Sequence, residues 1–278
     1  RSNTNEMMRV HLKSVVDELL TLNPDPEAVL DIAANDLTLL RNYPKETNKW
    51  GVDPNDIITK VDAEDIHVIN DFFPTRKLSP KTTYDCISIL AVMYDLDDPI
   101  SFLTAAMSKL SNYGVLALEV MYLPSIIKNL ALDTFLGEHL THWSLFTLEK
   151  LIQKCHGKII DVRETSTNGG SILVFVTQDY CIKYDKPEAK NRILELKKQE
   201  FDLGLDDQTV FVDFRKRVEQ WERDLKTLVH KLKSDGKKLG LYGCSTKSNV
   251  MIQACLLEKC FDYGIERSEE KVGGQTLW

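Results

Sequence analysis

Two adjacent ionisable residues, Glu138 and His139, form the pair in this chain that is best suited to proton transfer. A histidine gains or loses its proton near neutral pH, and a carboxylate beside it can orient the ring or raise its pKa. We therefore interpret the two as a catalytic acid–base pair. His142 is a competing candidate, and an exposed or helix-capping histidine is the alternative for either ring. Ser144 has the position of a helix N-cap.

Two aspartates follow apolar runs in a way that suits an adenosine-bearing cofactor. Asp31 lies at the end of the first apolar strand, and the small residues after it let the chain pass close to a ligand. Asp53 lies about 20 residues beyond that turn, at the tip of the next strand, where its carboxylate can accept both ribose hydroxyls. Nicotinamide and S-adenosylmethionine sites share this role. A purely structural aspartate is the alternative for Asp31.

The third apolar run ends in Asp71 and Phe72. A carboxylate there can accept a hydrogen bond from the adenine amine, while the aromatic ring covers the base. Burial in the core is the alternative for Phe72 and for Phe73 beside it, because phenylalanine is usually buried. Further along, the Asn-Gly-Gly-Ser segment 168–171 fits a hairpin turn, since Asn and Gly tolerate positive φ.

These residues need a sheet to position them, and seven apolar, strand-like runs supply one. The runs lie at 28–34, 49–54, 66–72, 84–90, 114–120, 158–164 and 171–178. Helical stretches between the first five predict an α/β fold with a mostly parallel sheet. The last two runs are separated only by 165–170, too short for a parallel crossover, so they must form an antiparallel hairpin. Five parallel strands followed by such a hairpin are typical of the class I methyltransferase, Rossmann-like sheet of seven strands.

The chain divides into four predicted parts. Residues 1–23 form an N-terminal amphipathic helix, and 24–180 form the cofactor-binding domain. Residues 181–236 are a charged helical linker with an apolar stripe that includes Trp221, Leu225 and Leu228. Residues 237–278 read as strand, helix and strand, which predicts a partial second Rossmann-like unit.

Composition narrows the function classes. The chain of 278 residues has a net charge of -7, which argues against nucleic acid as its main partner. We expect no membrane span, because no apolar run reaches the necessary length, and no secretory signal opens the chain. The six cysteines lack metal-ligand spacing, so we expect free thiols, no metal site and a cytoplasmic protein. The oligomeric state is not predicted.

Taken in order, six motifs resemble those of the S-adenosylmethionine-dependent sugar C-methyltransferases, which methylate a carbon beside the keto group of a nucleotide-linked deoxysugar. The motifs are DIAANDL (31–37), GVDP (51–54), DFF (71–73), EHLTHWSL (138–145), NGGS (168–171) and YGCSTKSN (242–249). The resemblance runs from about residue 4 to residue 277. It implies S-adenosylmethionine as cofactor and a small nucleotide-sugar as substrate.

The resemblance also implies roles for particular residues. His139, helped by Glu138, would remove the proton next to the ketone, and the enolate would attack the methyl group. The implied cofactor residues are Asp31, Ala33, Asn35, Asp53 and Asp71, with Phe72 over the adenine. The implied substrate residues are Gly169, Gly170, Ser171, Ser245, Lys247 and Asn249.

The chain departs from the family pattern at several places. Leu37 replaces a glycine and could crowd the cofactor loop, while Leu136 replaces a tyrosine. Ala91 and Asp95 stand where the family often has Asn and His. From the comparison with the family pattern we expect the chain to lack the N-terminal zinc module and to have a shortened C-terminal domain. Methyl transfer to oxygen or nitrogen of a nucleotide sugar, or a catalytically inactive binding protein, are therefore the alternatives; a nicotinamide oxidoreductase is disfavoured by the missing glycine fingerprint.

Overall fold

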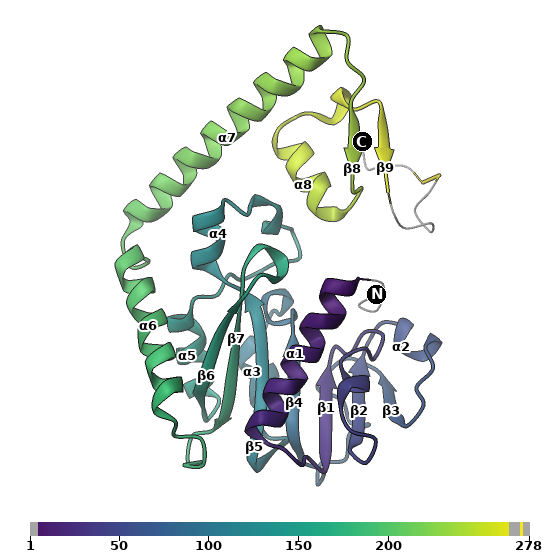
Figure 1. The fold of residues 1–278 in the computed structure, drawn as a ribbon, viewed down its shortest axis with the longest axis vertical. Coiled ribbons are helices and arrows are strands. Elements are labelled where there is room, and N and C mark those ends of the chain that lie inside the picture. The colour runs from purple at the N-terminus through teal and green to yellow at the C-terminus, as the bar shows by residue number, and fades with distance from the viewer. Residues whose placement is uncertain (1–4, 267–272, 275–278) are drawn as a thin grey trace. The chain divides into compact units, whose positions relative to one another are not determined.

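The computed structural model describes residues 5–266, 273 and 274, which form two compact units (Figure 1). The first unit contains the chain up to Tyr122 together with Leu140–Glu200. The second contains Leu123–His139 and the chain from Phe201 onward. The grouping thus assigns 123–139 to the C-terminal part, whereas the sequence-based division placed it in the cofactor-binding domain. Positions 1–4, 267–272 and 275–278 of the outermost predicted parts lie outside the described residues.

The first unit is built on a seven-stranded sheet in the order β3-β2-β1-β4-β5-β7-β6. The strands are β1 Ala28–Ile32, β2 Asn48–Asp53, β3 Ile66–Asn70, β4 Tyr84–Leu90, β5 Leu110–Met121, β6 Gly157–Thr165 and β7 Ser171–Gln178. Strands β1 to β5 are parallel, and β7 pairs antiparallel with both β5 and β6. The predicted sheet with its terminal hairpin is confirmed.

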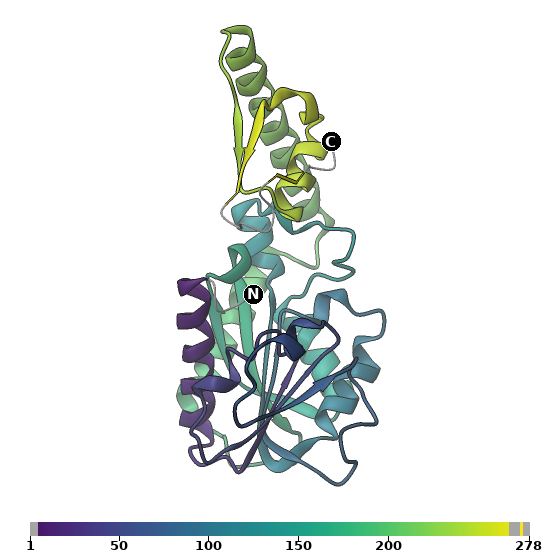
Figure 2. The ribbon, with the colours of Figure 1, turned by 90° about the vertical axis from the view of Figure 1, so that its right-hand side faces the viewer.

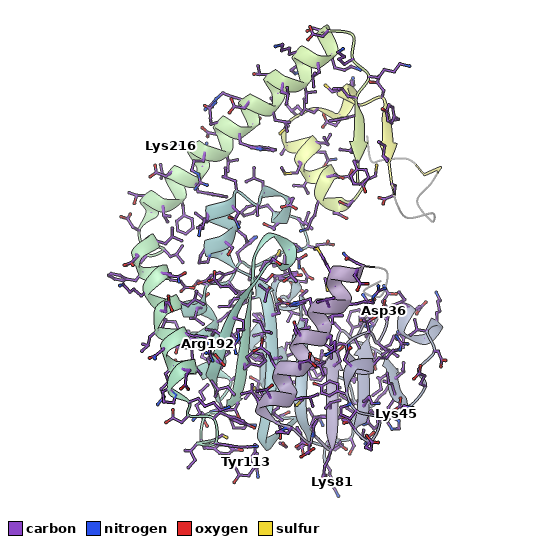
Figure 3. The ribbon with its side chains drawn as sticks, in the orientation of Figure 1. Asp36, Lys45, Lys81, Tyr113, Arg192 and Lys216 are labelled. Carbon is purple, nitrogen blue, oxygen red and sulfur yellow. The ribbon has the colours of Figure 1, made fainter. Side chains whose placement is uncertain are left out.

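This topology gathers several loops at one edge of the sheet. The carboxyl ends of parallel strands meet at the same edge, so the loops after β1, β2 and β3 are neighbours. Because β7 is antiparallel, its first residue, Ser171, lies opposite Met121 at the end of β5. The turn between β6 and β7 therefore lies at this edge too. Figure 3 shows Asp36 at this edge, with Lys81 and Tyr113 at the opposite one.

Helices cover both faces of the sheet (Figure 2). Helix α1, Glu6–Leu22, lies on one face and buries the side chains spaced along its apolar stripe: Leu12, Val15, Val16 and Leu19. Helices α3, Pro99–Met107, and α5, Leu145–Lys154, pack on the other face. Helix α6, Pro187–Leu203, is anchored to β6 by Arg192, which donates two hydrogen bonds to Asp161 at 2.9 and 2.6 Å.

The connections among the first strands correct one expectation. Helices were predicted between all of the first five strands, but β1 and β2 are joined through a short 3₁₀ turn, η2 Leu40–Asn42. A four-residue helix, α2 Ile57–Lys60, joins β2 to β3, and no helix joins β3 to β4. The apolar residues of the first connection still cover the sheet: Leu37, Leu39, Leu40 and Tyr43 are all buried in the core. The loop between β1 and β2 thus covers the sheet with its buried side chains, as a helix would.

The second unit has its own small core. A parallel pair, β8 Gly240–Tyr242 and β9 Tyr263–Ile265, flanks helix α8, Thr246–Ala254, as predicted for a strand–helix–strand unit. Helix α7, Gln208–Ser234, packs Trp221, Leu225 and Val229 against this unit. Leu228, which was predicted in the same stripe, is 54% exposed. Val229, the next residue along α7, is buried against α8 in its place.

The same unit contains the segment that precedes Leu140. It begins with α4, Leu123–Asn129, continues through the 3₁₀ turn η4, Leu132–Thr134, and ends at His139. Arg217 of α7 donates a hydrogen bond to the carbonyl of Lys128 at 3.0 Å, and the ring of Phe214 lies 6.2 Å from that of Phe135. In the part of the chain that the structure describes, no helix combines the length and apolarity needed to cross a membrane.

Candidate active site

The loop after β1 adopts an unusual backbone. Ala33, Asn35 and Leu37 all have positive φ, at 65°, 49° and 63°. The N–H groups of Ala33 and Ala34 both donate to the carbonyl of Val52, at 2.7 and 3.1 Å. Left-handed conformation is costly for residues with a Cβ, so the loop is held in shape by such contacts rather than by intrinsic preference.

Asp53 ties this loop to the next one. It lies at the end of β2 and is 7% exposed. Its Oδ2 atom accepts the N–H of Asn35 at 2.8 Å, and its Oδ1 atom accepts the N–H of Asn55 at 2.7 Å. Each carboxylate oxygen has a second lone pair, so both can accept a further donor. The structure thus brings the predicted residues Asp53 and Asn35 together.

Asp31 is buried beside this pair. The hydroxyl of Ser88 donates to its Oδ1 atom at 2.5 Å. Burial raises the pKa of Asp31 to about 7, the Ser88 hydrogen bond opposes the rise, and the nearby charge of Asp53 adds to it. Removal from water disfavours the charged form of a carboxyl group, which explains the direction.

Asp71 and Phe72 end β3 in different surroundings. The carboxylate of Asp71 accepts the N–H of Phe72 at 2.9 Å and the hydroxyl of Thr75 at 2.8 Å. The Thr75 hydrogen bond and the nearby Lys77 hold the pKa of Asp71 below its usual value. Phe72 is 75% exposed, so the core-packing alternative does not hold for it. Phe73 instead packs edge-on against Phe102, at 5.2 Å between ring centroids.

Leu37 does not project from the loop. Its side chain is fully buried in the core that the loop forms with the sheet. A Cβ atom at Gly51 would lie 2.8 Å from Cδ2 of Leu37, so the two positions are in direct contact. Leu37 therefore fills space beneath the loop instead of crowding the side where a ligand would approach.

The turn between β6 and β7 contains two of the predicted substrate residues, Gly169 and Gly170, and a third, Ser171, begins β7. Asn168, Gly169 and Gly170 have φ values of 52°, 85° and 127°, a series that favours Asn and Gly. The hydroxyl of Ser171 donates to the carbonyl of Thr167 at 3.0 Å, and the N–H of Tyr122 donates to the carbonyl of Gly170 at 3.1 Å. The turn is thus anchored at the same sheet edge as the ends of the strands that carry Asp31 and Asp53.

His139 lies in the second unit, and its ring is oriented by the backbone. Its Nδ1 atom lies 2.6 Å from the carbonyl oxygen of Thr134, a residue that is fully buried in η4. A carbonyl can only accept, so Nδ1 carries the hydrogen, and in the neutral ring the lone pair is on Nε2. Glu138 is exposed. Sequence reasoning missed the role of Thr134, because a main-chain carbonyl leaves no residue-type signal.

The predicted residues of α8 lie in the same unit as His139. Ser245 is the N-cap of α8 and forms a capping box with Ser248. Lys247 places its Nζ atom 3.5 Å from Asp133 Oδ2, next to Thr134 in η4. The Oδ1 atom of Asn249 is buried, and among the residues the structure describes it has no hydrogen-bond donor. A buried acceptor of this kind needs a donor, which a ligand can supply.

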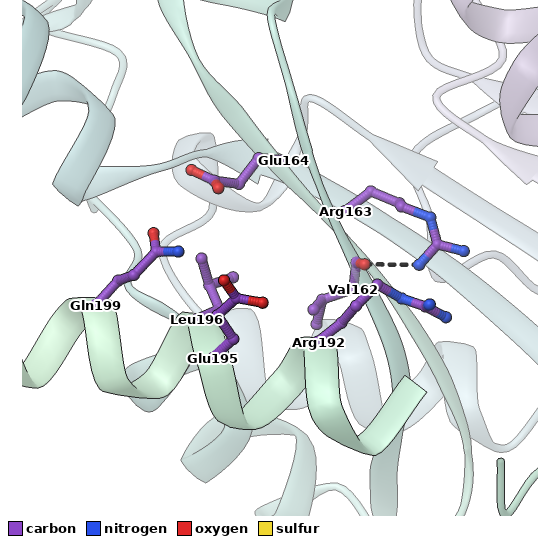
Figure 4. A pocket seen from close by; sticks show the side chains of 7 residues that line it. All are labelled: Val162, Arg163, Glu164, Arg192, Glu195, Leu196 and Gln199. Carbon is purple, nitrogen blue, oxygen red and sulfur yellow. Dashed lines mark hydrogen bonds between the residues drawn. The ribbon is translucent and has the colours of Figure 1, made fainter. Parts of the chain in front are cut away.

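Charged side chains between β6 and α6 form ion pairs that hold these two elements together. Between β6 and α6 a shallow cavity is lined by Val162, Arg163, Glu164, Arg192, Glu195, Leu196 and Gln199 (Figure 4). Its two guanidinium groups are engaged by Asp161, whose pKa is lowered by those hydrogen bonds although burial opposes the change. Among the described residues, no group of three or more His, Cys, Asp or Glu side chains is placed to hold a metal ion.

The chain matches two known protein families. Residues 5–157 match the family described as a methyltransferase domain, and residues 166–276 match the one described as the C-methyltransferase C-terminal domain. The C-methyltransferase NovU of Streptomyces niveus is 28% identical to this chain over 142 residues. The matched part is 51% of this chain and 33% of NovU, so the chain spans about a third of the length of this curated relative.

Solved structures share the fold. The plantazolicin methyltransferase BamL, in complex with a triazolic desmethylPZN analog and SAH, superposes with a TM-score of 0.51 at 12% identity, over 64% of this chain and 88% of that one. The plantazolicin methyltransferase BpumL, in complex with a pentazolic analog and SAH, gives 0.50 at 13% identity, over 63% and 86%. At these identities the likeness establishes the fold alone, which is the predicted class I methyltransferase fold.

Proposed function

The chain belongs to the S-adenosylmethionine-dependent methyltransferase family, and we propose that it methylates a carbon beside the keto group of a nucleotide-linked deoxysugar. Two family matches in sequence order and the likeness to a C-methyltransferase support transfer to carbon. The observation that carries the proposal is the hydrogen bond from His139 Nδ1 to the Thr134 carbonyl, at 2.6 Å. It leaves Nε2 of the neutral ring as the basic atom, which is what proton removal from carbon requires.

The residues at the sheet edge fit an adenosine-type cofactor. Asp53 retains lone pairs for ribose hydroxyls, Phe72 offers an exposed aromatic face for a base, and Leu37 leaves the loop surface clear. Asp31 and Asn35 complete the set that would hold it. When bound, S-adenosylmethionine supplies an electrophilic methyl group.

The remaining predicted residues would act on the sugar nucleotide. His139 Nε2 takes the proton from the carbon beside the ketone, and that carbon becomes the nucleophile. Gly169 and Gly170 present backbone without side chains, so a substrate can approach the turn closely. Lys247 and the buried Oδ1 atom of Asn249 would meet the nucleotide, with Lys247 exchanging Asp133 for a phosphate.

Solvent exchange tests the proposal directly. The chain, saturated with S-adenosylhomocysteine, is incubated in D₂O with thymidine diphosphate 4-keto-6-deoxyglucose, and NMR follows deuterium entering the carbon beside the ketone. We expect wild-type protein to catalyse exchange and His139→Gln to lose it while binding S-adenosylhomocysteine normally. His156→Gln, a change at an exposed histidine, is the matched control. Exchange that persists in His139→Gln would remove this base from the mechanism.

Transfer to oxygen or nitrogen is the second candidate, and Leu136 favours it. The family tyrosine at this position could contact a keto-sugar, whereas Leu136 is apolar and 9% exposed. Such a reaction needs a base but no enolate. Methylated product formed without deuterium at the neighbouring carbon would identify it, and binding of the cofactor without any product would identify an inactive binding protein.

A further inference from the structure

A buried carboxylate outside the predicted site, that of Glu119, collects three donors. Glu119 lies near the end of β5 and is 5% exposed. Its Oε1 atom accepts the hydroxyls of Thr165 at 2.6 Å and Thr167 at 2.9 Å. Its Oε2 atom lies 2.7 Å from Nε2 of His11 on α1. No predicted role used any of these four residues.

A carboxylate at this place needs an explanation. Val115 and Ala117, which alternate with Glu119 along β5, are apolar and belong to the core beneath α1. Burying a charged group costs free energy that well-packed apolar side chains avoid, unless hydrogen bonds offset the loss of water. The three donors supply that offset, and two of them come from one short segment. The segment is the hairpin turn that contains Gly169 and Gly170.

We propose that Glu119 is a positioning residue that fixes the 165–170 turn, and through it the bound substrate; the second half of this inference rests on the proposed function of that turn. Thr167 links Glu119 to the rest of the turn. Its side chain is held by Glu119, while its carbonyl accepts the N–H of Gly170 at 2.9 Å and the hydroxyl of Ser171 at 3.0 Å. Anchoring Thr167 therefore sets the position of the residues that follow.

The turn depends on such an anchor because its own residues restrain it weakly. Two adjacent glycines have the widest backbone freedom of any pair, so an untethered turn would sample many conformations. Ordering it on binding would lower affinity, and an already ordered turn avoids that loss. Glu119 also accepts the N–H of Ala91 on its backbone carbonyl at 2.9 Å, which ties the loop after β4 to the same residue.

His11 completes the arrangement from the other side. Nε2 of its ring donates to Glu119 Oε2, and the side chain is 13% exposed. The residue belongs to α1, whose apolar stripe is fixed in the core of the first unit. Glu119 thus connects α1 to the 165–170 turn, and the carboxylate cannot rotate away without losing His11.

The decisive variant removes one hydroxyl while keeping shape. Thr167→Val deletes the donor to Glu119, whereas Thr167→Ser retains it. Thr177→Val is the matched control: Thr177 is a fully buried threonine of β7 that donates to the Gly114 carbonyl at 2.8 Å, at the opposite end of the hairpin. Amide hydrogen exchange at Gly170 and Tyr122 reports on the turn, and steady-state kinetics with thymidine diphosphate 4-keto-6-deoxyglucose report on substrate.

We expect Thr167→Val to speed exchange at both amides and to raise KM about tenfold, because loss of one hydrogen bond to a charged group lowers the population of the ordered turn by about that factor. The kcat value and the affinity for S-adenosylhomocysteine should stay within twofold, and Thr167→Ser and Thr177→Val should resemble wild type. Exchange and KM that change no more in Thr167→Val than in Thr177→Val would overturn the proposal. Absence of turnover in wild type would refute the proposed function, and the exchange data would still decide whether Glu119 orders the turn.

Discussion

Leu37 packs directly over Gly51: a Cβ atom at Gly51 would lie 2.8 Å from Cδ2 of Leu37. Ala34 and Leu40 close the remaining space, at 3.1 and 3.2 Å. Leu37 also has a φ of 63°, where the family pattern has glycine. The left-handed conformation costs about 1–2 kcal/mol for a residue with a Cβ, whereas burial of a leucine side chain stabilises by about 1.5–3 kcal/mol. The substitution is therefore compatible with a stable loop.

Gly51→Ala should destabilise the first unit. The new methyl group would overlap Leu37 in a closed part of the core, and overpacking of this kind costs about 1–3 kcal/mol. Urea denaturation of the variant measures the free energy of unfolding. Gly137→Ala is the control, because a Cβ there meets nothing within 4 Å. Combining Gly51→Ala with Leu37→Ala should cost less than the sum of the two single changes; strict additivity would contradict the contact.

The raised pKa of Asp31 predicts a pH-dependent stability. Burial shifts it from 3.8 to about 7, so the folded state holds the proton more tightly than the unfolded state. The contribution of Asp31 to the free energy of unfolding is therefore fully present at low pH. This contribution falls between about pH 4 and about pH 7, by at most about 1.4 kcal/mol per pH unit, and stays constant at higher pH.

Comparison of Asp31→Asn with wild type isolates this effect. The amide cannot ionise and can still accept the Ser88 hydroxyl, so the stability of the variant relative to wild type should grow between about pH 4 and about pH 7 and stay constant above. Chemical denaturation at several pH values measures the difference. Asp71→Asn should show no such trend, because the pKa of Asp71 is lowered and its titration lies below this range. A constant difference for Asp31→Asn would refute the assignment.

Asp53→Ala should weaken cofactor binding and loosen two loops together. The change removes the acceptor of the Asn35 and Asn55 N–H groups as well as the proposed ribose contact. We expect affinity for S-adenosylhomocysteine, measured by calorimetry, to fall by about 1–3 kcal/mol. Asp56→Ala removes the same charge from an exposed position nearby and should have little effect. Equal affinities in the two variants would argue against the ribose role.

The positions of the strands could be predicted from the sequence more accurately than the connections between the strands. The bounds of β4 and β7 agree with the predicted runs 84–90 and 171–178, because each is an apolar stretch that ends at a turn. The prediction of a helix after β1 was wrong, because Ala33, Asn35 and Leu37 have positive φ, which interrupts a helical backbone, and the apolar residues are buried from a loop instead.

Some site residues could likewise be placed from the sequence, and others could not. Asp53 and Asn35 could be placed near one another from motif order, because Asp53 ends one parallel strand, Asn35 follows another, and the loops at a sheet edge meet. The carbonyl of Thr134 and the carboxylate of Glu119 could not, because the first is a main-chain atom and the second bonds His11 across 108 positions of sequence. Contacts at such separations are set by tertiary packing and leave no local spacing to read.

Glu200 offers a last test, because it caps a helix from a distant part of the chain. It is 6% exposed and accepts the N–H groups of Leu145 and Phe146 at the start of α5, the second at 3.0 Å, and the hydroxyl of Tyr122 at 2.8 Å. A negative charge at a helix N-terminus is stabilising, and more so where water is excluded. Glu200→Gln should lower the free energy of unfolding by about 1–3 kcal/mol.

Thermal and urea denaturation measure this effect against Glu195→Gln, a change at an exposed glutamate of the same helix that should stay within about 0.5 kcal/mol of wild type. A double-mutant cycle with Tyr122→Phe isolates the coupling between Tyr122 and Glu200. Tyr122 donates to Oε1 of Glu200, so the two changes should be coupled, and the double variant should lose less than the sum. Additive losses would show that Tyr122 and Glu200 act independently and would contradict this hydrogen bond.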